Sequence, residues 1–312
     1  VFSGRVPFFS HFKREELVTA MGKQRIFARN LKNSTMPISM HGKNFTAKLN
    51  LDESLQGKME DLFNHYNPDY AAFVAIDPAT GKVLALVDYS SAGHSNNLNI
   101  RATYPAASIF KVVTSAAALE EKKLQPRSLI AWNGSAGTLY KRNLREQVTR
   151  WTRFISVEEA LAKSINTVFA KIAMNRLGSE TLQKYANAFG FNQNIPFDMI
   201  IDPSLAIIPT DSYGLAESGS GFTRRQTLSP MQGALMASAI INGGAMPEPH
   251  LVDSVSDENG RLVYKAEEKT ISHPLDAETA RTLSIMMENT ITLGTAHKQY
   301  RDYNHHPLLS KL

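Results

Sequence analysis

The strongest chemical signal in this chain is a serine followed three residues later by a lysine, Ser108 and Lys111. On a helix, residues three apart share one face, so the two side chains can meet. A serine hydroxyl is a weak nucleophile, but a neutral lysine amine can accept its proton, and burial lowers the pKa of a lysine. At a helix N-terminus, backbone N–H groups also favour an oxyanion that develops beside the serine. The pair therefore suits a nucleophile and its general base.

Both short motifs that carry this chemistry occur twice, so their surroundings must separate the copies. Ser-x-x-Lys stands at 10–13, before a charged run that cannot form a buried helix, and at 108–111, where it opens the most apolar helix. Its companion, Ser-x-Asn, stands at 95–97 in a polar loop and at 164–166 at a break between two predicted helices. These contexts favour the second copy of each motif, so Ser164 and Asn166 join the candidate site. Taken alone, the 108–111 pair fits a helix cap and a surface-reaching lysine equally well.

Three predicted helices must position these side chains. The helix from Ala107 to Glu121 is apolar on nearly all sides, which is typical of a helix buried at the centre of a domain. Ser156–Glu159 is a capping box that opens a helix to about Lys163, and a second helix runs from Asn166 to Leu177 and stops at Gly178. The break between the last two helices holds the Ser-x-Asn motif, where side chains can project into a cleft.

The remaining elements indicate an α+β fold, because strand signals come early and helices dominate the middle. We predict a helix at 52–65 and a β-hairpin at 71–76 and 83–87. Ser229 should cap a helix that ends at Asn242, and Asp276 should cap another that runs to about Ile291. Residues 1–46, by contrast, are basic and have no sustained period, and Pro37, Gly42 and the run 33–35 indicate loop. We expect residues 1–46 to be an N-terminal extension or the stub of an upstream region.

The composition is that of a globular protein and excludes several function classes. The 312 residues allow one large domain or two ordinary ones. Lysine and arginine exceed aspartate and glutamate by 34 to 29, and this scattered surplus favours a solvated surface over a nucleic-acid face. The absence of cysteine excludes disulfides, thiol catalysis and thiolate metal sites, and it fits an oxidising compartment. The nine histidines show no ligand spacing, so we expect no metal.

The motifs of several other classes of enzyme and binding protein are absent. The chain has no Gly-x-Ser-x-Gly, no phosphate-binding loop, no Gly-x-Gly-x-x-Gly and no His-Glu-x-x-His. No apolar run approaches the roughly 18 residues of a membrane helix, and the start does not resemble a signal peptide. Val1 is not an initiator methionine, so we expect that upstream sequence was removed.

The segment Tyr104–Val112 resembles the nucleophile motif of penicillin-binding protein transpeptidase domains. In that family a Ser-x-Asn follows after some 50-odd residues, and here 56 residues separate Ser108 from Ser164. The resemblance continues in order along the chain, over about residues 47–312. Its further segments are Leu51–Gln56, Asp77–Val87, Ile155–Ala173, Phe189–Phe191, Leu228–Gln232, Asn242–Gly244 and Gly294–Ala296.

One family motif, Lys-Thr/Ser-Gly, is absent, because Lys269-Thr270 is followed by Ile271. In the family this motif comes shortly after Gly-Thr-Ala, on a strand that lines the cleft, and the chain stops at Leu312 about where that strand should begin. We therefore expect a transpeptidase domain at 47–312 that lacks its C-terminal strands, with one face of the 71–87 hairpin left uncovered. The remainder of the polypeptide should begin within a few residues of Leu312 and contain the missing motif.

The resemblance implies a β-lactamase/transpeptidase-like fold, with an antiparallel sheet flanked by helices and a mostly helical subdomain. It implies a peptidoglycan D,D-transpeptidase that is acylated by stem peptides and by β-lactams at Ser108. Lys111 would be the general base, Ser164 would relay protons, and Asn166 would bind the substrate peptide and help to hold Lys111. It implies no metal, no organic cofactor and no nucleic-acid partner. The expected location is extracytoplasmic, with a membrane anchor in a removed N-terminal segment.

Three alternatives stay open at this stage. A D,D-carboxypeptidase uses the same residues and differs in whether water reaches the acyl-enzyme. A penicillin-binding-like scaffold or sensor would have lost turnover together with the third motif. A serine β-lactamase fits less well, because class A enzymes carry Ser-Asp-Asn with a deacylating glutamate and class D enzymes carry Ser-x-Val, whereas this chain has Ser164-Ile165-Asn166.

Overall fold

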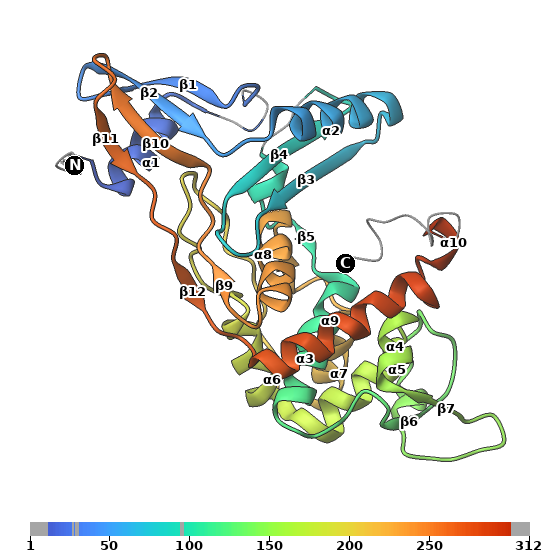
Figure 1. The fold of residues 1–312 in the computed structure, drawn as a ribbon. Helices are drawn as coiled ribbons and strands as arrows, with labels where there is room; N and C mark the ends of the chain where they lie inside the picture. Colours follow the sequence, from blue (N-terminus) through green and yellow to red (C-terminus); the bar gives the residue numbers. More distant parts are fainter. Residues whose placement is uncertain (1–11, 27, 29–30, 94–96, 301–312) are drawn as a thin grey trace, which may run out of the picture.

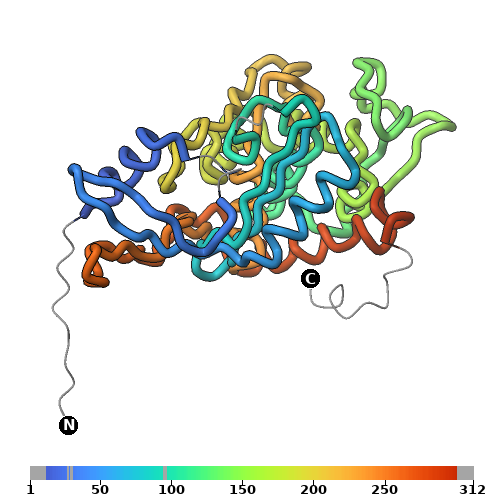
Figure 2. The backbone as a smooth tube through the Cα atoms, turned by 90° about the horizontal axis from the view of Figure 1, so that it is seen from above, coloured from blue at the N-terminus to red at the C-terminus, as the bar shows by residue number. Residues whose placement is uncertain are grey.

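The computed structural model describes residues 12–26, 28, 31–93 and 97–300 of the chain, so Ser10 and Ser95 lie outside the described residues. The predicted α+β class is confirmed: small antiparallel sheets surround a mostly helical half (Figure 1). Figures 1 and 2 place a four-stranded sheet and the loop between β6 (Leu129–Trp132) and β7 (Arg153–Ser156) at opposite ends of the molecule. No helix of the described part is long and apolar enough to cross a membrane.

The four-stranded sheet corrects the prediction of loop near residues 33–42. Its strands are β1 (Thr35–Met40), β2 (Lys43–Leu49), β10 (Val252–Asp257) and β11 (Leu262–Lys265), in the order β1-β2-β10-β11. His41 and Gly42 both have positive φ, as a two-residue hairpin turn requires. Pro37 is tolerated because β1 is the edge strand of this sheet. His41 and Gly42 therefore form the turn of a β-hairpin and not part of a loop. The predicted boundary at residue 46 falls inside β2.

Helix α1 (Arg14–Lys23) is fastened to the rest of the chain by a buried charge cluster. The Asp198 carboxylate, which is fully buried, accepts hydrogen bonds from Arg14 Nε at 2.9 Å and from the backbone N–H groups of Leu251 and Val252 at 2.6 and 2.8 Å. The same guanidinium forms an ion pair with Glu248. The N-terminal helix is thus anchored to loops that lie more than 180 residues further along the chain.

The predicted hairpin and its preceding helix are confirmed. Strands β3 (Tyr70–Ile76) and β4 (Val83–Ser90) pair antiparallel, and α2 (Glu53–Tyr66) packs on β4. Asp52 caps α2 by accepting a hydrogen bond from the backbone N–H of Leu55. Strand β3 pairs with β4 alone among the described residues, and its side chains are exposed or half-buried.

The helical half is built around α3 (Phe110–Glu120), which follows the 3-10 turn η3 (Ala107–Ile109). Eight of the eleven residues of α3 are buried, as its apolar sequence predicts. The elements that pack against α3 are α4 (Val157–Ala162), α5 (Asn166–Ile172), the π-helical η5 (Ala173–Leu177), α6 (Gly178–Ala188), α7 (Ser212–Ser220) and α9 (Ala277–Thr292). Gly178 does end the predicted second helix, but α6, which was not predicted, begins there at once.

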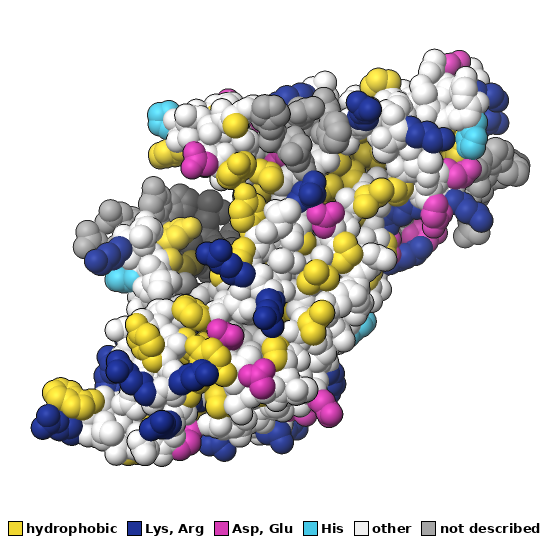
Figure 3. All heavy atoms as spheres, turned by 180° about the vertical axis from the view of Figure 1, so that it is seen from behind, with side chains coloured by type: hydrophobic (Ala, Val, Ile, Leu, Met, Phe, Trp, Pro, Cys, Tyr) yellow, Lys and Arg dark blue, Asp and Glu magenta, His cyan; other side chains and the backbone are white. Residues whose placement is uncertain are grey.

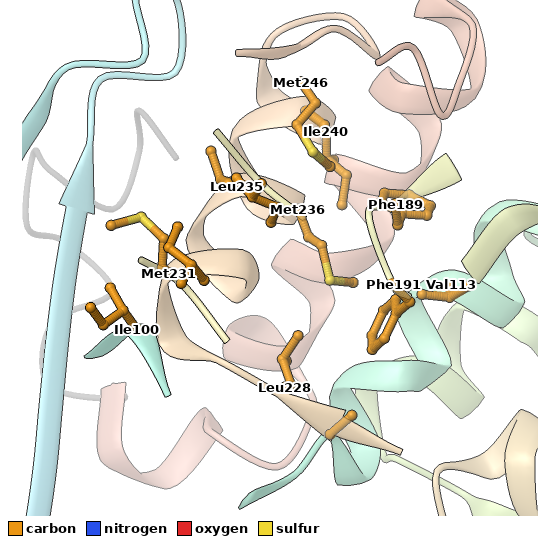
Figure 4. Close-up of a cluster of buried hydrophobic side chains, with 14 of the residues drawn as sticks. Ile100, Val113, Phe189, Phe191, Leu228, Met231, Leu235, Met236, Ile240 and Met246 are labelled. Atoms are coloured by element: carbon orange, nitrogen blue, oxygen red, sulfur yellow. The ribbon is translucent and has the colours of Figure 1, made fainter. Parts of the chain in front are cut away.

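Helix α8 (Pro230–Ile241) joins the helical half to the sheets. It is capped by Ser229 and ends at Asn242, as predicted. Its buried face meets Phe189, Phe191 and Val113 in one apolar cluster (Figure 4). The remaining elements are η2 (Leu98–Ile100), β5 (Tyr104–Pro105), η4 (Lys141–Leu144), β8 (Thr227–Leu228), β9 (Met246–Pro247), β12 (Thr270–Ser272) and α10 (His297–Tyr300).

Candidate active site

Ser108 lies in the exposed turn η3, at the N-terminal end of the buried helix α3. The chain is fixed just before it, because β5 pairs with β8 and the Ala106 N–H donates to the Gln226 carbonyl at 2.8 Å. Ala107 has a φ of 47°, a conformation that costs free energy in a residue with a side chain. The Ala107 carbonyl also packs closely against Gly221, where a Cβ would overlap it, so this position requires a glycine. The nucleophile candidate is thus held in place by its backbone.

Lys111 lies one turn further along, with its ammonium directed at Ser108. Its Nζ donates to Ser108 Oγ at 2.8 Å and to the carbonyl oxygen of Ser220 at 2.8 Å. The side chain is 1% exposed and has no carboxylate partner among the described residues, so burial lowers its pKa to about 8. When Nζ is neutral, its lone pair can accept the Ser108 proton while an N–H stays on the Ser220 carbonyl.

The Ser220 carbonyl is itself held by the end of α7. Thr114, on α3, donates from Oγ1 to the Gly219 carbonyl at 2.7 Å, and the Ser220 hydroxyl donates to Ala216 O at 2.8 Å. Gly219 lies so close to the first residue of η5 that a Cβ there would overlap the Ala173 side chain. No motif predicts this contribution, because it comes from a backbone oxygen. The run of small residues at 218–221 is the sequence feature that allows the close approach.

Ser164 reaches the same point from another direction. It lies between α4 and α5 with a φ of 52°, and its hydroxyl donates to Ser108 Oγ at 2.9 Å. Ser108 Oγ is therefore bracketed by Lys111 Nζ and Ser164 Oγ. The three side chains that the sequence singled out from positions 108, 111 and 164 form one continuous hydrogen-bond chain that can carry a proton.

Asn166 lies beside this chain but does not hold Lys111. Its Nδ2 donates to the Gly137 carbonyl at 2.9 Å and its backbone N–H donates to the Ala136 carbonyl at 2.8 Å. No hydrogen bond joins Asn166 to Lys111 among the described residues. The second hydrogen bond of Lys111 goes to the Ser220 carbonyl, and Asn166 binds the backbone of the loop after β6. This part of the expectation from the resemblance is corrected by the structure.

The C-terminal end of α9 closes the other side of α4. The Thr295 N–H donates to the Ala162 carbonyl at 3.1 Å, and a Cβ at Gly294 would overlap that carbonyl. Gly294-Thr295-Ala296 therefore supports the turn that carries Ser164, two residues after Ala162.

Comparison with known proteins agrees with this geometry. Residues 71–306 match the family described as penicillin binding protein transpeptidase domain. Stage V sporulation protein D of Bacillus subtilis is 26% identical over 270 residues, which cover 81% of this chain and 42% of that protein. Peptidoglycan D,D-transpeptidase PbpA of Mycobacterium tuberculosis is 29% identical over 276 residues, covering 78% of this chain and 55% of that protein. The chain thus spans about half the length of these curated relatives.

Solved structures give the same result for the fold. Penicillin-binding protein A from M. tuberculosis, in its ceftriaxone acyl-enzyme complex, superimposes with a TM-score of 0.67 at 26% identity, covering 79% of this chain and 62% of that one. The D,D-transpeptidase domain of a peptidoglycan glycosyltransferase from Eggerthella lenta gives 0.67 at 22% identity, over 80% of this chain and 66% of that one. The β-lactamase/transpeptidase-like fold predicted from the motifs is therefore confirmed.

Proposed function

Because the chain belongs to the penicillin-binding protein transpeptidase family, we propose that it carries the acylation centre of a peptidoglycan D,D-transpeptidase. The observation that carries this proposal is the position of Ser108 Oγ, 2.8 Å from Lys111 Nζ and 2.9 Å from Ser164 Oγ. A nucleophile with a base on one side and a second hydroxyl on the other has the proton-transfer groups that acyl transfer between amines needs.

In the acylation step, Ser108 Oγ attacks the carbonyl carbon of the D-Ala-D-Ala bond. Its proton passes to the neutral amine of Lys111, which becomes an ammonium. The C–N bond of the tetrahedral intermediate then breaks, and the nitrogen of the leaving D-Ala receives a proton from Lys111 through the Ser164 hydroxyl. The product is an ester on Ser108, with Lys111 neutral again.

In the second step, an amine from a neighbouring stem peptide attacks the ester carbonyl. The attacking nitrogen loses a proton through Ser164 to Lys111, and Lys111 returns that proton to Ser108 Oγ as the ester C–O bond breaks. Asn166 binds the substrate peptide from the edge of the site. A β-lactam enters at the first step, because its strained amide mimics the D-Ala-D-Ala bond, and it remains as an ester on Ser108.

This function places the protein where its substrate is, on the outer side of the cytoplasmic membrane. The relatives named peptidoglycan D,D-transpeptidase act on peptidoglycan, and the acyl-enzyme complexes of a related structure contain β-lactams. In this proposal the acyl-transfer domain lies within residues 47–312. Strands β1 and β2 are not a separate extension, because β2 (Lys43–Leu49) crosses residue 46 and pairs with β10. Neither a metal nor an organic cofactor enters any step.

Labelling by a fluorescent penicillin, followed by product analysis on a synthetic D-Ala-D-Ala peptide, tests the proposal. We expect Ser108 to be labelled and D-Ala to be released, with the acyl group transferred to an added amine acceptor in preference to water. Transfer to water alone would indicate a D,D-carboxypeptidase, and turnover of the penicillin a β-lactamase. The absence of labelling would contradict an acylation centre and indicate a scaffold.

A further inference from the structure

The segment from Leu129 to Phe154, which we call the basic arm, carries a dense set of exposed apolar side chains. It comprises β6, the loop after it, which projects from the helical half (Figure 1), and the first two residues of β7. Trp151 and Val148 are each 72% exposed, the highest values among the large apolar side chains of this arm. The other exposed apolar residues of the arm are Leu129, Tyr140 and Phe154.

Positive charges outnumber negative charges among the side chains of the basic arm. The exposed cations of the basic arm are Lys141, Arg142, Arg145, Arg150 and Arg153. None of them forms an ion pair with a described residue, and the arm contains one carboxylate, Glu146, which accepts a hydrogen bond from Asn175 at 2.6 Å. Figure 3 shows lysine, arginine and hydrophobic side chains gathered at this end of the molecule. The surface therefore suits an anionic ligand.

Cations and aromatic rings of the basic arm are arranged in pairs. Arg150 lies 4.8 Å from the ring centre of Trp151, and Arg153 lies 3.6 Å from that of Trp132. A third arginine, Arg142, is 5.4 Å from the ring of Tyr140. In such pairs the guanidinium lies over one face of the ring. Trp132 is buried, whereas Trp151 and Tyr140 are exposed and offer the rest of their rings to a ligand. A ligand with both carboxylates and apolar faces, such as sugar rings, can use the two kinds of group together.

The loop of the basic arm contacts the candidate active site. The carbonyls of Ala136 and Gly137, at the beginning of its loop, accept the two hydrogen bonds of Asn166, which lies two residues after Ser164. A polymer bound along the arm would therefore pass beside the residues that bracket the Ser108 hydroxyl. This position, rather than charge alone, identifies the kind of ligand.

We propose that the basic arm binds a peptidoglycan strand, with its cations on the stem-peptide carboxylates and its exposed rings against the sugars. The inference rests on the proposed function, because it names the polymer on which the acylation centre acts. The contacts add to affinity for the polymer and leave the chemistry at Ser108 unchanged. A small acylating agent such as a penicillin does not span the arm and gains nothing from it.

The test compares a basic-arm variant with a control of equal charge change. The arm variant carries Arg145→Ala, Arg150→Ala and Trp151→Ala. The control carries Lys58→Ala, Arg281→Ala and Tyr66→Ala, which also removes two exposed cations and one ring, and Tyr66 is 72% exposed like Trp151. Both proteins are sedimented with purified sacculi stripped of teichoic acid, and both are labelled with a fluorescent penicillin.

We expect the wild type to sediment with sacculi, less so as salt increases, because charge contacts are screened. The arm variant should bind at least tenfold more weakly, the control within twofold of wild type, and all three should be labelled at rates within twofold. Equal sedimentation of wild type and arm variant would overturn the inference, as would a wild type that does not sediment. In a parallel sedimentation with phosphatidylglycerol vesicles, an arm variant that binds sacculi like wild type but binds the vesicles more weakly would assign the arm to a membrane surface instead. Failure of the proposed function would appear separately, as absence of penicillin labelling.

Discussion

The depressed pKa of Lys111 makes the rate of acylation depend on pH in a defined way. Burial lowers this pKa from its ordinary value of 10.5 to about 8, and only the neutral amine can accept the Ser108 proton. For a single deprotonation at about pH 8, the neutral fraction is about 1% at pH 6, about 10% at pH 7 and half at pH 8. The acylation rate should therefore rise about 50-fold between pH 6 and pH 8 and level off above.

Stopped-flow acylation by a fluorescent penicillin between pH 6 and pH 9 measures this profile. Intact penicillin at each pH, incubated without protein, corrects for its own hydrolysis. A rate that keeps rising tenfold per pH unit up to pH 9 would mean that the pKa is not depressed. A rate that is flat between pH 6 and pH 8 would mean that a different group is the base, and either result would refute the reasoning from burial.

Three further changes test separate parts of the structure. Lys111→Arg keeps the charge but cannot deprotonate, so acylation should fall by about 10²–10⁴, and an unchanged rate in the same assay would exclude the base role. Thr114→Val removes the hydrogen bond to the Gly219 carbonyl that holds the end of α7, so acylation should slow about tenfold. The control is Thr167→Val, which removes a buried hydroxyl without a partner among the described residues and should leave the rate unchanged. Equal rates for the two variants would show that the Thr114 hydrogen bond is dispensable. Arg14→Ala leaves the fully buried Asp198 carboxylate without its cation, so the free energy of unfolding should fall by about 3 kcal/mol in a urea titration. A loss of less than about 1 kcal/mol would show that this ion pair does not anchor α1.

Local sequence signals were sufficient for most helices and for the hairpin of β3 and β4. The predicted caps at Ser156, Ser229 and Asp276 accept hydrogen bonds from the helices that they open, and the helix predicted at 52–65 is capped by its first residue, Asp52. Each depends on residues within one or two turns, which is why it could be read from the sequence. The position of the 108–111 motif in front of a buried helix follows from the same local reasoning, because an all-round apolar helix has to be central.

Other features depend on contacts between distant residues and could not be predicted. Strand β2 pairs with β10, which lies some 200 residues away, so no local period revealed that sheet. Pro37 and Gly42 were interpreted as loop because the same residues serve loops, edge strands and hairpin turns. The carbonyl of Ser220 carries no residue-specific signal, and only the fold brings it to Lys111.

The measurement that tests the central claim most directly is the location of the penicillin adduct. Trypsin cleaves after Arg101 and after Lys111, so Ser108 falls in the peptide 102–111, where it is the only serine. We predict that mass spectrometry of penicillin-treated protein finds the adduct on this peptide, at Ser108, and that Ser108→Ala abolishes it. An adduct on any other peptide, or one that survives Ser108→Ala, would contradict the assignment of the nucleophile.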